Sequence, residues 1–321
     1  MEFLNRGKPP GVDRSDPGLE CCRPLSSRRN PMRVRLPDRL KFQWQKLSYS
    51  WRELRWASLA GRSRTFVMRL QPGLKMRLYG DSELCHLIYC RSFEVTERAF
   101  LNHFLRPGDV FVDVGANIGL FTLIAASCVG PKGKVVAFEP TKVTYTRLVE
   151  NIRLNNLSNV SCVNLALSDR SGHVDLIQST DGFDAWNSLA EPTMGKTFSS
   201  ERVEVVEWDR YARTHNLAGL VTMMKIDVEG WEQRVLAGGK EVFARPDAPV
   251  LQVEFTDAAA KAARSSCRNL YEFLQSLGYR MFLYDLCQRR LVQESLREQY
   301  PYVNLIAVKN PDFVSRRCAG L

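Results

Sequence analysis

Runs of consecutive apolar residues recur along this chain between segments of helical periodicity, and the most informative run begins at residue 110. Residues 110–121 read V-F-V-D-V-G-A-N-I-G-L-F. The first five are apolar except for Asp113, as expected of a strand buried on both faces of a parallel sheet. The run breaks at Gly115, reaches Gly119 four residues later and continues into an apolar helix over 120–128. This order of strand, glycine loop and helix is typical of the start of a doubly wound nucleotide-binding fold.

Six further apolar stretches have the length of strands, and helical patterns separate most of them. These stretches lie at 134–138, 160–167, 220–226, 250–255, 279–284 and 303–308. Strands that alternate with helices predict an α/β fold with a mostly parallel, seven-stranded sheet and an antiparallel hairpin at its edge. Residues 172–178 and 202–208 alternate like antiparallel additions. The polar segment between them, 179–200, is long enough to be an active-site lid.

The first 92 residues differ from the rest in composition. Residues 1–38 are rich in Pro, Gly, Ser and Arg, which predicts a disordered basic extension. From 40 to 59, apolar residues recur at three- and four-residue steps between basic ones, which predicts an amphipathic helix. Such a helix either binds a membrane surface or a partner, or packs on its own core or in a dimer interface, and the sequence leaves these alternatives open. A β-hairpin is predicted over 64–89.

These patterns divide the chain into four parts. The expected parts are a disordered basic extension over 1–38, a helix and hairpin appendage over 39–92, the α/β domain over 93–310 and a C-terminal tail over 311–321.

The net charge of +10 is concentrated at the N-terminal end. Residues 1–64 hold 15 Lys and Arg against 6 Asp and Glu, which leaves 30 against 29 in the remainder of the chain. The basic charge therefore belongs to the N-terminal region and not to the α/β domain.

Membrane spans, export and disulfides are not expected. No apolar run approaches the ~18 residues of a spanning helix, and the first residues lack the apolar segment of a signal peptide. The nine cysteines are irregularly spaced, so we expect reduced thiols in a cytoplasmic protein. Cys85, His86 and Cys90 are close in sequence, but we expect them to be strand residues of the hairpin rather than zinc ligands.

The spacing of the glycines separates two classes of ligand. A dinucleotide loop needs G-x-G-x-x-G, and here the middle glycine between Gly115 and Gly119 is missing. Asp113 lies within the strand, where it would repel a pyrophosphate. S-adenosylmethionine, whose ammonium and sulfonium groups are cationic, suits a pocket with this carboxylate better. Glu139 follows the second strand, twenty positions after Gly119, at the spacing of a carboxylate that binds ribose hydroxyls.

Several motifs together resemble the FkbM family of S-adenosylmethionine-dependent O-methyltransferases. The resemblance extends from about residue 92 to 308. The motifs that carry it are F-V-D-V-G-A-N-I-G-L-F-T, K-I-D-V-E-G-W-E, Phe93-Glu94, N-L-A-L-S-D at 164–169, Asn187-Ser188 and Val253-Glu254. It implies a Rossmann-like class I methyltransferase fold, and a place for Glu94 in the donor site beside Asp113, Gly115, Asn117 and Gly119. Trp208-Asp209 departs from the family's usual Leu-Asp.

The acidic residues at strand ends are the candidates for chemistry. In an open α/β sheet the ligand lies beyond the carboxyl ends of the strands, where Glu139, Ser168, Asp227, Glu229 and Glu254 fall. An acceptor hydroxyl needs a base to take its proton during methyl transfer. Asp227 is the first candidate, either as this base or as a carboxylate of the donor pocket, and Glu229 is the second.

The alternatives for these acids stay open. Glu229 could instead cap the helix that begins near residue 230, and Glu254 could orient the acceptor or pair with a buried arginine. A divalent ion between Asp227 and Glu229 has no third ligand that the sequence identifies, so no metal site is expected. None of the four histidines has a catalytic context.

Two functions from different classes follow. The first is transfer of a methyl group to a hydroxyl of a small-molecule, sugar or polyketide-type acceptor, with S-adenosylmethionine as donor. The second is a nucleic-acid-binding or nucleic-acid-modifying methyltransferase that uses the basic N-terminal region. The near-neutral α/β domain and the absence of a base-methylating Asp/Asn-Pro-Pro-Tyr tetrad speak against nucleic acid as a partner.

Overall fold

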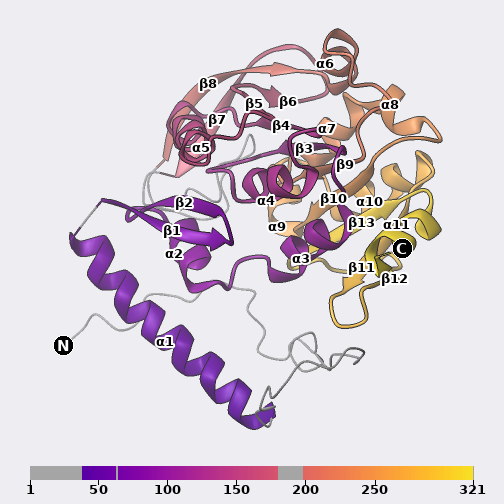
Figure 1. Ribbon diagram of the computed structural model, residues 1–321. Coiled ribbons are helices and arrows are strands. Elements are labelled where there is room, and N and C mark those ends of the chain that lie inside the picture. Colours follow the sequence, from indigo (N-terminus) through magenta and orange to yellow (C-terminus); the bar gives the residue numbers. More distant parts are fainter. Residues whose placement is uncertain (1–37, 63, 180–197, 321) are drawn as a thin grey trace.

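An eight-stranded, mostly parallel sheet forms the centre of the molecule (Figure 1). The computed structural model describes residues 38–62, 64–179 and 198–320. In spatial order the strands are β12 (Arg290–Gln293), β11 (Arg280–Asp285), β13 (Val303–Val308), β10 (Val250–Phe255), β9 (Met223–Ile226), β3 (Val110–Val114), β4 (Lys134–Phe138) and β5 (Val160–Val163). The run from β10 to β5 is parallel, and β13, β11 and β12 pair antiparallel. The sequence predicted seven of these strands, and β12 is an eighth that it did not predict.

Helices cover both faces of this sheet. One apolar core lies beneath α3 (Val95–Phe104), α4 (Leu120–Val129), α5 (Lys142–Leu154) and α11 (Pro311–Ala319). The other lies beneath α6 (Trp208–Thr214), α7 (Glu232–Ala237), α8 (Lys240–Ala244), α9 (Asp257–Ala262) and α10 (Cys267–Ser276). The side chains of β3 alternate between the two cores, with Phe111 in the first and Val112 in the second. Burial on both faces explains why the strands read as continuous apolar runs.

A smaller sheet extends the domain beside the second core. Its order is β6 (Ala166–Leu167), β8 (Phe198–Val206) and β7 (Gly172–Ser179), with β7 and β8 antiparallel as predicted. Residues 160–167, predicted as one strand, divide into β5 of the large sheet and β6 of the small one. Most of the predicted lid, and with it Asn187 and Ser188, lies outside the described residues.

The appendage consists of a long helix, a hairpin and a short helix. They are α1 (Asp38–Arg62), β1 (Thr65–Gln71), β2 (Leu74–Tyr79) and α2 (Glu83–Cys90). The prediction of strand structure for Cys85, His86 and Cys90 is wrong, because all three lie in α2. Ser82 caps this helix by accepting a hydrogen bond from the Cys85 amide at 3.1 Å.

Asn151 of α5 and Asn155, which caps the C-terminus of that helix, attach the hairpin to the α/β domain. Asn151 Oδ1 accepts from the Arg77 amide at 2.6 Å, and Asn155 Oδ1 accepts from the Lys75 amide at 2.7 Å. Both Nδ2 atoms donate to the carbonyls of the same residues of β2. Met76, between them, is fully buried. The hairpin therefore packs on the domain through polar and apolar contacts in alternation.

Residues 311–319, expected to belong to a tail, form helix α11 on the first core. Pro311 occupies its first turn and Gly320 ends it in the left-handed conformation. Val314 and Cys318 are buried, and Arg317 forms an ion pair with Asp109 at the start of β3. Among the described helices, α1 to α11, none is long and apolar enough to span a membrane.

Candidate active site

The glycine loop after β3 is shaped by packing against a second loop. Gly115 adopts φ +80°, and a Cβ there would lie 1.9 Å from the carbonyl oxygen of Asp227. The glycine is thus required to bring the ends of β3 and β9 together. Gly119, with φ +94°, faces Leu148 of α5 and begins α4. The same glycines that predicted a ligand loop therefore also set the distance between the two loops.

Asp113 is buried at the carboxyl end of β3, as expected, and only half of its carboxylate is satisfied. Oδ2 accepts from Thr122 Oγ1 at 2.6 Å. Oδ1 is buried without a hydrogen-bond partner among the described residues. Burial raises the pKa of this carboxyl above its usual value. An unsatisfied buried oxygen costs free energy, so this position favours a ligand that donates or carries positive charge.

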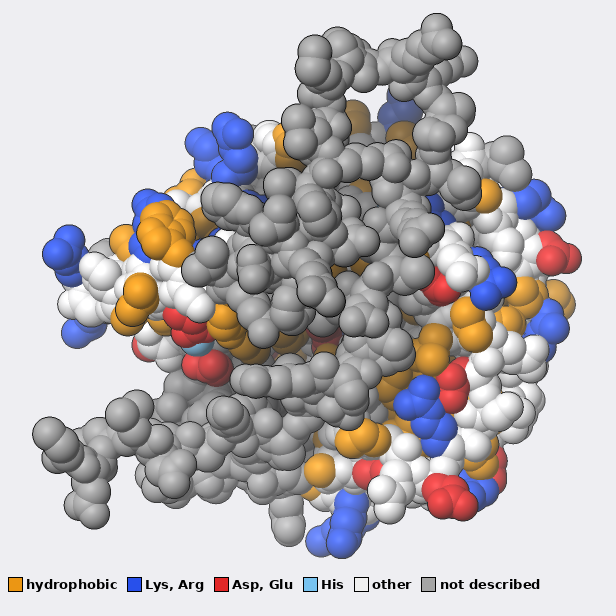
Figure 2. Space-filling model, turned by 90° about the horizontal axis from the view of Figure 1, so that it is seen from below, with side chains coloured by type: hydrophobic (Ala, Val, Ile, Leu, Met, Phe, Trp, Pro, Cys, Tyr) orange, Lys and Arg blue, Asp and Glu red, His pale blue; other side chains and the backbone are white. Residues whose placement is uncertain are grey.

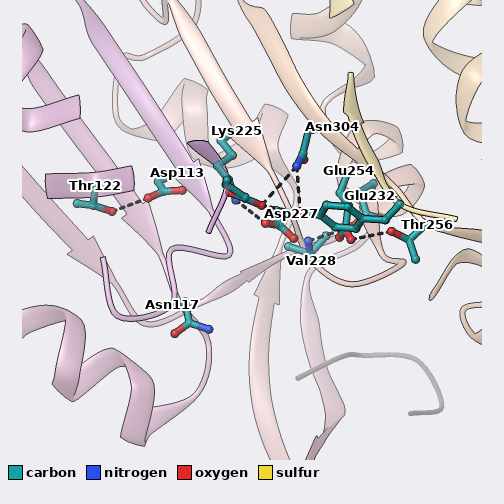
Figure 3. Close-up of polar contacts among 12 residues, drawn as sticks. Asp113, Asn117, Thr122, Lys225, Asp227, Val228, Glu232, Glu254, Thr256 and Asn304 are labelled. Atoms are coloured by element: carbon teal, nitrogen blue, oxygen red, sulfur yellow. Dashed lines mark hydrogen bonds and ion pairs between the residues drawn. The ribbon is translucent and has the colours of Figure 1, made fainter. Parts of the chain in front are cut away.

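A buried ion pair lies at the centre of the site. Lys225 Nζ contacts Asp227 Oδ2 at 2.5 Å, and the two side chains are 4% and 19% exposed (Figure 3). Burial would raise the pKa of Asp227, but the Lys225 ammonium outweighs it and holds that pKa below the usual range. Burial would likewise lower the pKa of Lys225, but the carboxylates of Asp227, Glu94 and Asp113 outweigh it, so this pKa is raised. Both members of the pair are therefore charged at neutral pH.

Three glutamates surround this ion pair. Burial raises the pKa of Glu229 and of Glu254 well above the usual value, and the Asp227 charge adds to both shifts. Glu254 Oε1 accepts from Thr256 Oγ1 at 2.8 Å, so its partner here is a threonine and not the buried arginine that was one of the two alternatives for this residue. Glu232 Oε1 accepts from the amides of Val228 and Gly230 at 3.0 and 3.2 Å. Glu232, the first residue of α7, thus holds the loop that precedes this helix, and burial raises its pKa to about 7. The capping role considered for Glu229 stays a prediction.

Glu94, which directly precedes α3, contributes its carboxyl group to the same cluster. Its Oε1 accepts from Tyr302 Oη at 2.8 Å and from Asn304 Nδ2 at 3.3 Å, both from the region of β13. Its Oε2 is buried without a partner among the described residues. Burial raises the pKa of Glu94 to about 8. Asn304 lies opposite Glu254 in the antiparallel pairing of β10 with β13, which places both beside Asp227 (Figure 3).

Glu139 and Ser168 lie at the neighbouring strand ends. Glu139 Oε2 accepts from the Asn117 amide at 3.0 Å, and its Oε1 accepts from the amide and hydroxyl of Thr141. Burial raises its pKa to about 7. Ser168 accepts from the Trp231 indole at 3.1 Å and contacts Asp169, so it supports the loop after β9 rather than the acidic cluster itself.

Three residues of the site other than glycine hold a left-handed backbone. Their φ angles are +43° at Glu94, +49° at Asn117 and +53° at Glu229. This conformation is uncommon for glutamate, and such strain concentrates at functional sites. Glu94 therefore begins α3 without a side-chain cap, and its carboxylate is directed toward β13 instead.

The structure thus brings Asp113, Asp227, Glu229, Glu254 and Glu94 into one cluster, with the glycine loop and Glu139 beside it. The sequence patterns predict no role for Glu232, Tyr302, Asn304 or Lys225. The polar Asn304 interrupts an otherwise apolar strand, and this signal could have identified it. Lys225 carried a comparable signal, as the one charged residue of β9.

Comparisons with known proteins agree with this arrangement. Residues 113–281 match the family described as the methyltransferase FkbM domain. The chain belongs to the FkbM methyltransferase family. The matched region, which is more than half of the chain, contains the glycine loop, Glu139 and the cluster from Asp227 to Glu254.

Relatives with curated descriptions match over similar ranges. The chain is 33% identical over 162 residues to methyltransferase sdnD of Sordaria araneosa, covering 42% of this chain and 62% of that protein. It is 27% identical over 186 residues to 2-O-methyltransferase NoeI of Sinorhizobium fredii, covering 53% and 73%. It is 32% identical over 171 residues to 31-O-demethyl-FK506 methyltransferase FkbM of Streptomyces tacrolimicus, covering 44% and 65%. The chain therefore spans less than two thirds of the first and third of these relatives.

Among solved structures, methyltransferase FkbM from Methylobacillus flagellatus is similar, at 15% identity and a TM-score of 0.39, over 70% of this chain and 54% of that one.

The residues of the FkbM domain fit S-adenosylmethionine, the methyl donor of this family. Five carboxyl groups, those of Glu94, Asp113, Asp227, Glu229 and Glu254, gather around a single ammonium, that of Lys225. Three of them, Glu94, Asp113 and Glu254, have a buried oxygen without a partner among the described residues. Burial raises the pKa of four of these groups, and a cationic ligand beside them would stabilise their ionised forms. Glu139 and Asn117 lie beside it in contact with each other.

A metal ion is the other cation to consider. Carboxylate oxygens of Asp227, Glu229 and Glu254 come within 4.8 Å of one another, so Glu254 is placed where a third ligand would be needed. Lys225 already supplies positive charge to Asp227, and nothing further in the cluster distinguishes a metal from a cationic organic ligand.

Proposed function

We propose that the protein transfers a methyl group from S-adenosylmethionine to a hydroxyl of a small-molecule or glycan acceptor. The acidic cluster around Lys225 and Asp227, with its unsatisfied carboxylate oxygens, is the observation that carries this proposal. Two similar proteins are named as a 2-O-methyltransferase and as a 31-O-demethyl-FK506 methyltransferase. These names support an oxygen atom as acceptor, on a sugar or a polyketide-type molecule.

The donor side of the site is formed by the glycine loop and the strand ends around it. Glu139 accepts hydrogen bonds from the ribose hydroxyls, since it follows β4 at the level of the loop. Asp113 and Glu94 provide negative charge for the cationic amino-acid portion, with Asn117 and the backbone at Gly115 and Gly119 around it. Bound here, S-adenosylmethionine supplies an electrophilic methyl carbon.

The acceptor side requires a proton acceptor, because a hydroxyl is a weak nucleophile. We assign this role to Glu229 rather than to Asp227. Lys225 holds the pKa of Asp227 low, which makes Asp227 a weak base, whereas burial raises the pKa of Glu229. Asp227 then keeps Lys225 in place and contributes charge to the donor pocket. Glu229 would take the proton of the acceptor hydroxyl while the methyl carbon–sulfur bond of the donor breaks, so that S-adenosylhomocysteine leaves as the acceptor oxygen gains the methyl group.

The first test is calorimetric titration of the full chain with S-adenosylmethionine. Binding is expected, and its absence at millimolar donor would refute the proposal. The second test incubates donor and protein with a panel of hydroxylated sugars and macrolactones, and measures S-adenosylhomocysteine and the methylated product by mass spectrometry. A methyl group found only on nitrogen or carbon would contradict an O-methyltransferase.

The nucleic-acid alternative rests on the basic N-terminal region, of which residues 1–37 lie outside the described part. None of the three relatives named above is described as acting on nucleic acid. Retention of labelled RNA or DNA on filters at physiological salt would be the observation in its favour.

We further propose that the outer face of α1 contacts an anionic membrane surface. Trp51 and Leu54 are 58% and 75% exposed, and the guanidinium of the exposed Arg55 lies over the Trp51 ring, 5.0 Å from its centroid. The opposite face packs on the appendage, where Trp56 is buried against Phe66. On the face seen from below, hydrophobic and basic side chains lie interleaved in the described part of the chain (Figure 2). Apolar aromatic groups among basic ones favour the interface of an anionic bilayer.

This contact is tested by sedimentation with vesicles of anionic lipid. Trp51→Glu should abolish binding, whereas Val143→Glu, at an exposed apolar residue of α5, should not. Equal sedimentation of the two variants would contradict the proposal. The cytoplasmic location of the protein stays a prediction.

A further inference from the structure

A second cluster of side chains that can bind metal lies between α1 and α2. Glu53 comes from α1, and His86 and Cys90 come from α2. His86 and Cys90 are four residues apart, so they project from the same face of their helix. Glu53 Oε2 lies 3.0 Å from His86 Nε2, and Glu53 Oε1 lies 3.5 Å from Cys90 Sγ. One ligand atom from each residue lies within 4.8 Å of the other two.

We propose that Glu53, His86 and Cys90 bind a zinc ion that joins α1 to α2. Tetrahedral zinc with Zn–N and Zn–O bonds of ~2.0 Å and a Zn–S bond of ~2.3 Å separates its ligand atoms by about 3.3 Å for N and O, and about 3.5 Å for S and O. The two oxygens of Glu53 lie at similar separations from the two neighbours, Oε2 at 3.0 Å from His86 Nε2 and Oε1 at 3.5 Å from Cys90 Sγ. A turn of the carboxylate would bring one oxygen toward both, and one ligand atom from each residue already lies within 4.8 Å of the other two. Small side-chain adjustments therefore suffice to admit the ion.

The surroundings of His86 are those of a metal ligand. Its second ring nitrogen, Nδ1, lies 3.3 Å from Glu83 Oε1. A carboxylate in this position fixes the ring orientation and leaves Nε2 available to the metal. The ring also stacks on Trp56, with 5.3 Å between centroids and 28° between planes. This indole shields one side of the cluster from water, and Cys90 is only 3% exposed.

The kinds of ligand atom select the ion. Calcium and magnesium take oxygen ligands, whereas one sulfur, one nitrogen and one oxygen suit zinc. The thiolate of Cys90 and the carboxylate of Glu53 together balance the charge of a divalent ion. Three protein ligands leave the fourth position for water. Since α1 and α2 are separate elements, the ion adds a link between them that exists only in the folded chain.

The test uses the full-length protein after removal of metal by a chelator and dialysis. Zinc is then titrated in competition with a chromophoric chelator, and cobalt(II) is titrated separately as a spectroscopic probe. We expect one zinc per chain, and a cobalt spectrum with a thiolate charge-transfer band and the strong visible bands of four-coordination. The cobalt spectrum of the unsubstituted chain tests thiolate ligation even if a variant fails to fold.

Four variants locate the ion. Cys90→Ser should remove the thiolate band and stoichiometric zinc binding, and Glu83→Gln should weaken zinc binding about 10- to 100-fold. Cys128→Ser, which replaces another free thiol, should bind zinc as the unsubstituted chain does. Glu254→Gln should also bind it unchanged, since that residue belongs to the acidic cluster. Zinc binding that is absent, that survives in Cys90→Ser, or that is lost in Glu254→Gln would overturn the proposal.

Discussion

Replacing Lys225 by methionine tests whether the acidic site depends on one buried ammonium. Methionine keeps most of the length and apolar volume of the side chain and removes the charge. Lys225 pairs with Asp227 at 2.5 Å and also balances Glu94 and Asp113. Lys225→Met therefore leaves three carboxyl groups without their counter-charge, whereas Asp227→Asn leaves the ammonium with the other two. We expect Lys225→Met to be the more destabilising change.

The size of the effect follows from burial. The two side chains are 4% and 19% exposed, so water screens the pair weakly. Removing one partner of a buried ion pair costs about 3–5 kcal/mol. For a domain of this size, that loss lowers the melting temperature by about 6–20 °C. Asp227→Asn should lie at or below the lower end of this range.

The loss should also depend on pH. Without Lys225, burial raises the pKa of each neighbouring carboxyl in the folded state above its unfolded value of about 4. A carboxyl with a raised folded pKa contributes stability that is fully present below its unfolded pKa and is lost as the pH rises through the folded one. The Lys225→Met protein should therefore approach the stability of the unsubstituted protein as the pH is lowered from 8 toward 5.

Calorimetric melting of both variants at several pH values provides the measurement. Lys132→Met, at an exposed turn residue, is the matched control and should melt like the unsubstituted protein. A Lys225→Met protein as stable as this control at pH 8 would refute the reasoning. So would a loss that is the same at pH 5 and pH 8, or an Asp227→Asn variant that is the less stable of the two.

Three other substitutions test the remaining parts of the site. Glu139→Ala should raise the dissociation constant of S-adenosylmethionine about 10- to 1000-fold, because two charge-assisted hydrogen bonds of ~1.5–3 kcal/mol each are lost. Calorimetry measures this constant, and an unchanged donor affinity would place the adenosine elsewhere. Glu229→Gln should lower turnover about 10²–10⁴-fold with little change in donor affinity, whereas a parallel loss of both would make Glu229 part of the donor pocket. Gly115→Ala should lower the melting temperature clearly more than Gly130→Ala. Both glycines have positive φ, but only at Gly115 would a Cβ meet a carbonyl oxygen, at 1.9 Å. Equal decreases in melting temperature would show that backbone strain alone matters.

The parallel strands of the core could be predicted because the apolar character of their residues follows directly from burial. β3 and β4 are apolar since both of their faces are covered, and the acids that follow them stand out against that background. The rim position of Asp113, Glu139 and Asp227 follows from strand direction alone. No knowledge of side-chain contacts is needed for that step.

The errors concern short elements at the periphery, where capping decides the structure. Helix α2 was predicted as strand, although Ser82 followed by the acidic Glu83 is a helix start. Helix α11 was predicted as tail, although Asn310, Pro311 and Gly320 are typical of its two ends. These capping residues are visible in the sequence, and they are sufficient to predict both helices.

The partners within the site could not be predicted, because they join residues far apart in the chain. The contact of Glu94 with Asn304 spans 210 positions and depends on how α3 meets β13. The left-handed backbone of Glu94 and Glu229 opposes the preference of glutamate, so local propensity argues against it. Such features are set by the packing of the whole domain.

Backbone strain and charge at this site have a common explanation. A left-handed glutamate is retained only where the surrounding structure compensates for it, and Glu94 and Glu229 both direct carboxyl groups to the cluster around Lys225. Like charges held together in a buried site raise one another's pKa, which destabilises the empty protein at neutral pH. A cationic ligand relieves this repulsion when it binds, so part of its affinity comes from strain and repulsion already present in the fold. A pocket organised in this way favours the donor over the product, because methyl transfer removes the sulfonium charge while the ammonium is kept. The weaker compensation of the repulsion by the product favours its release.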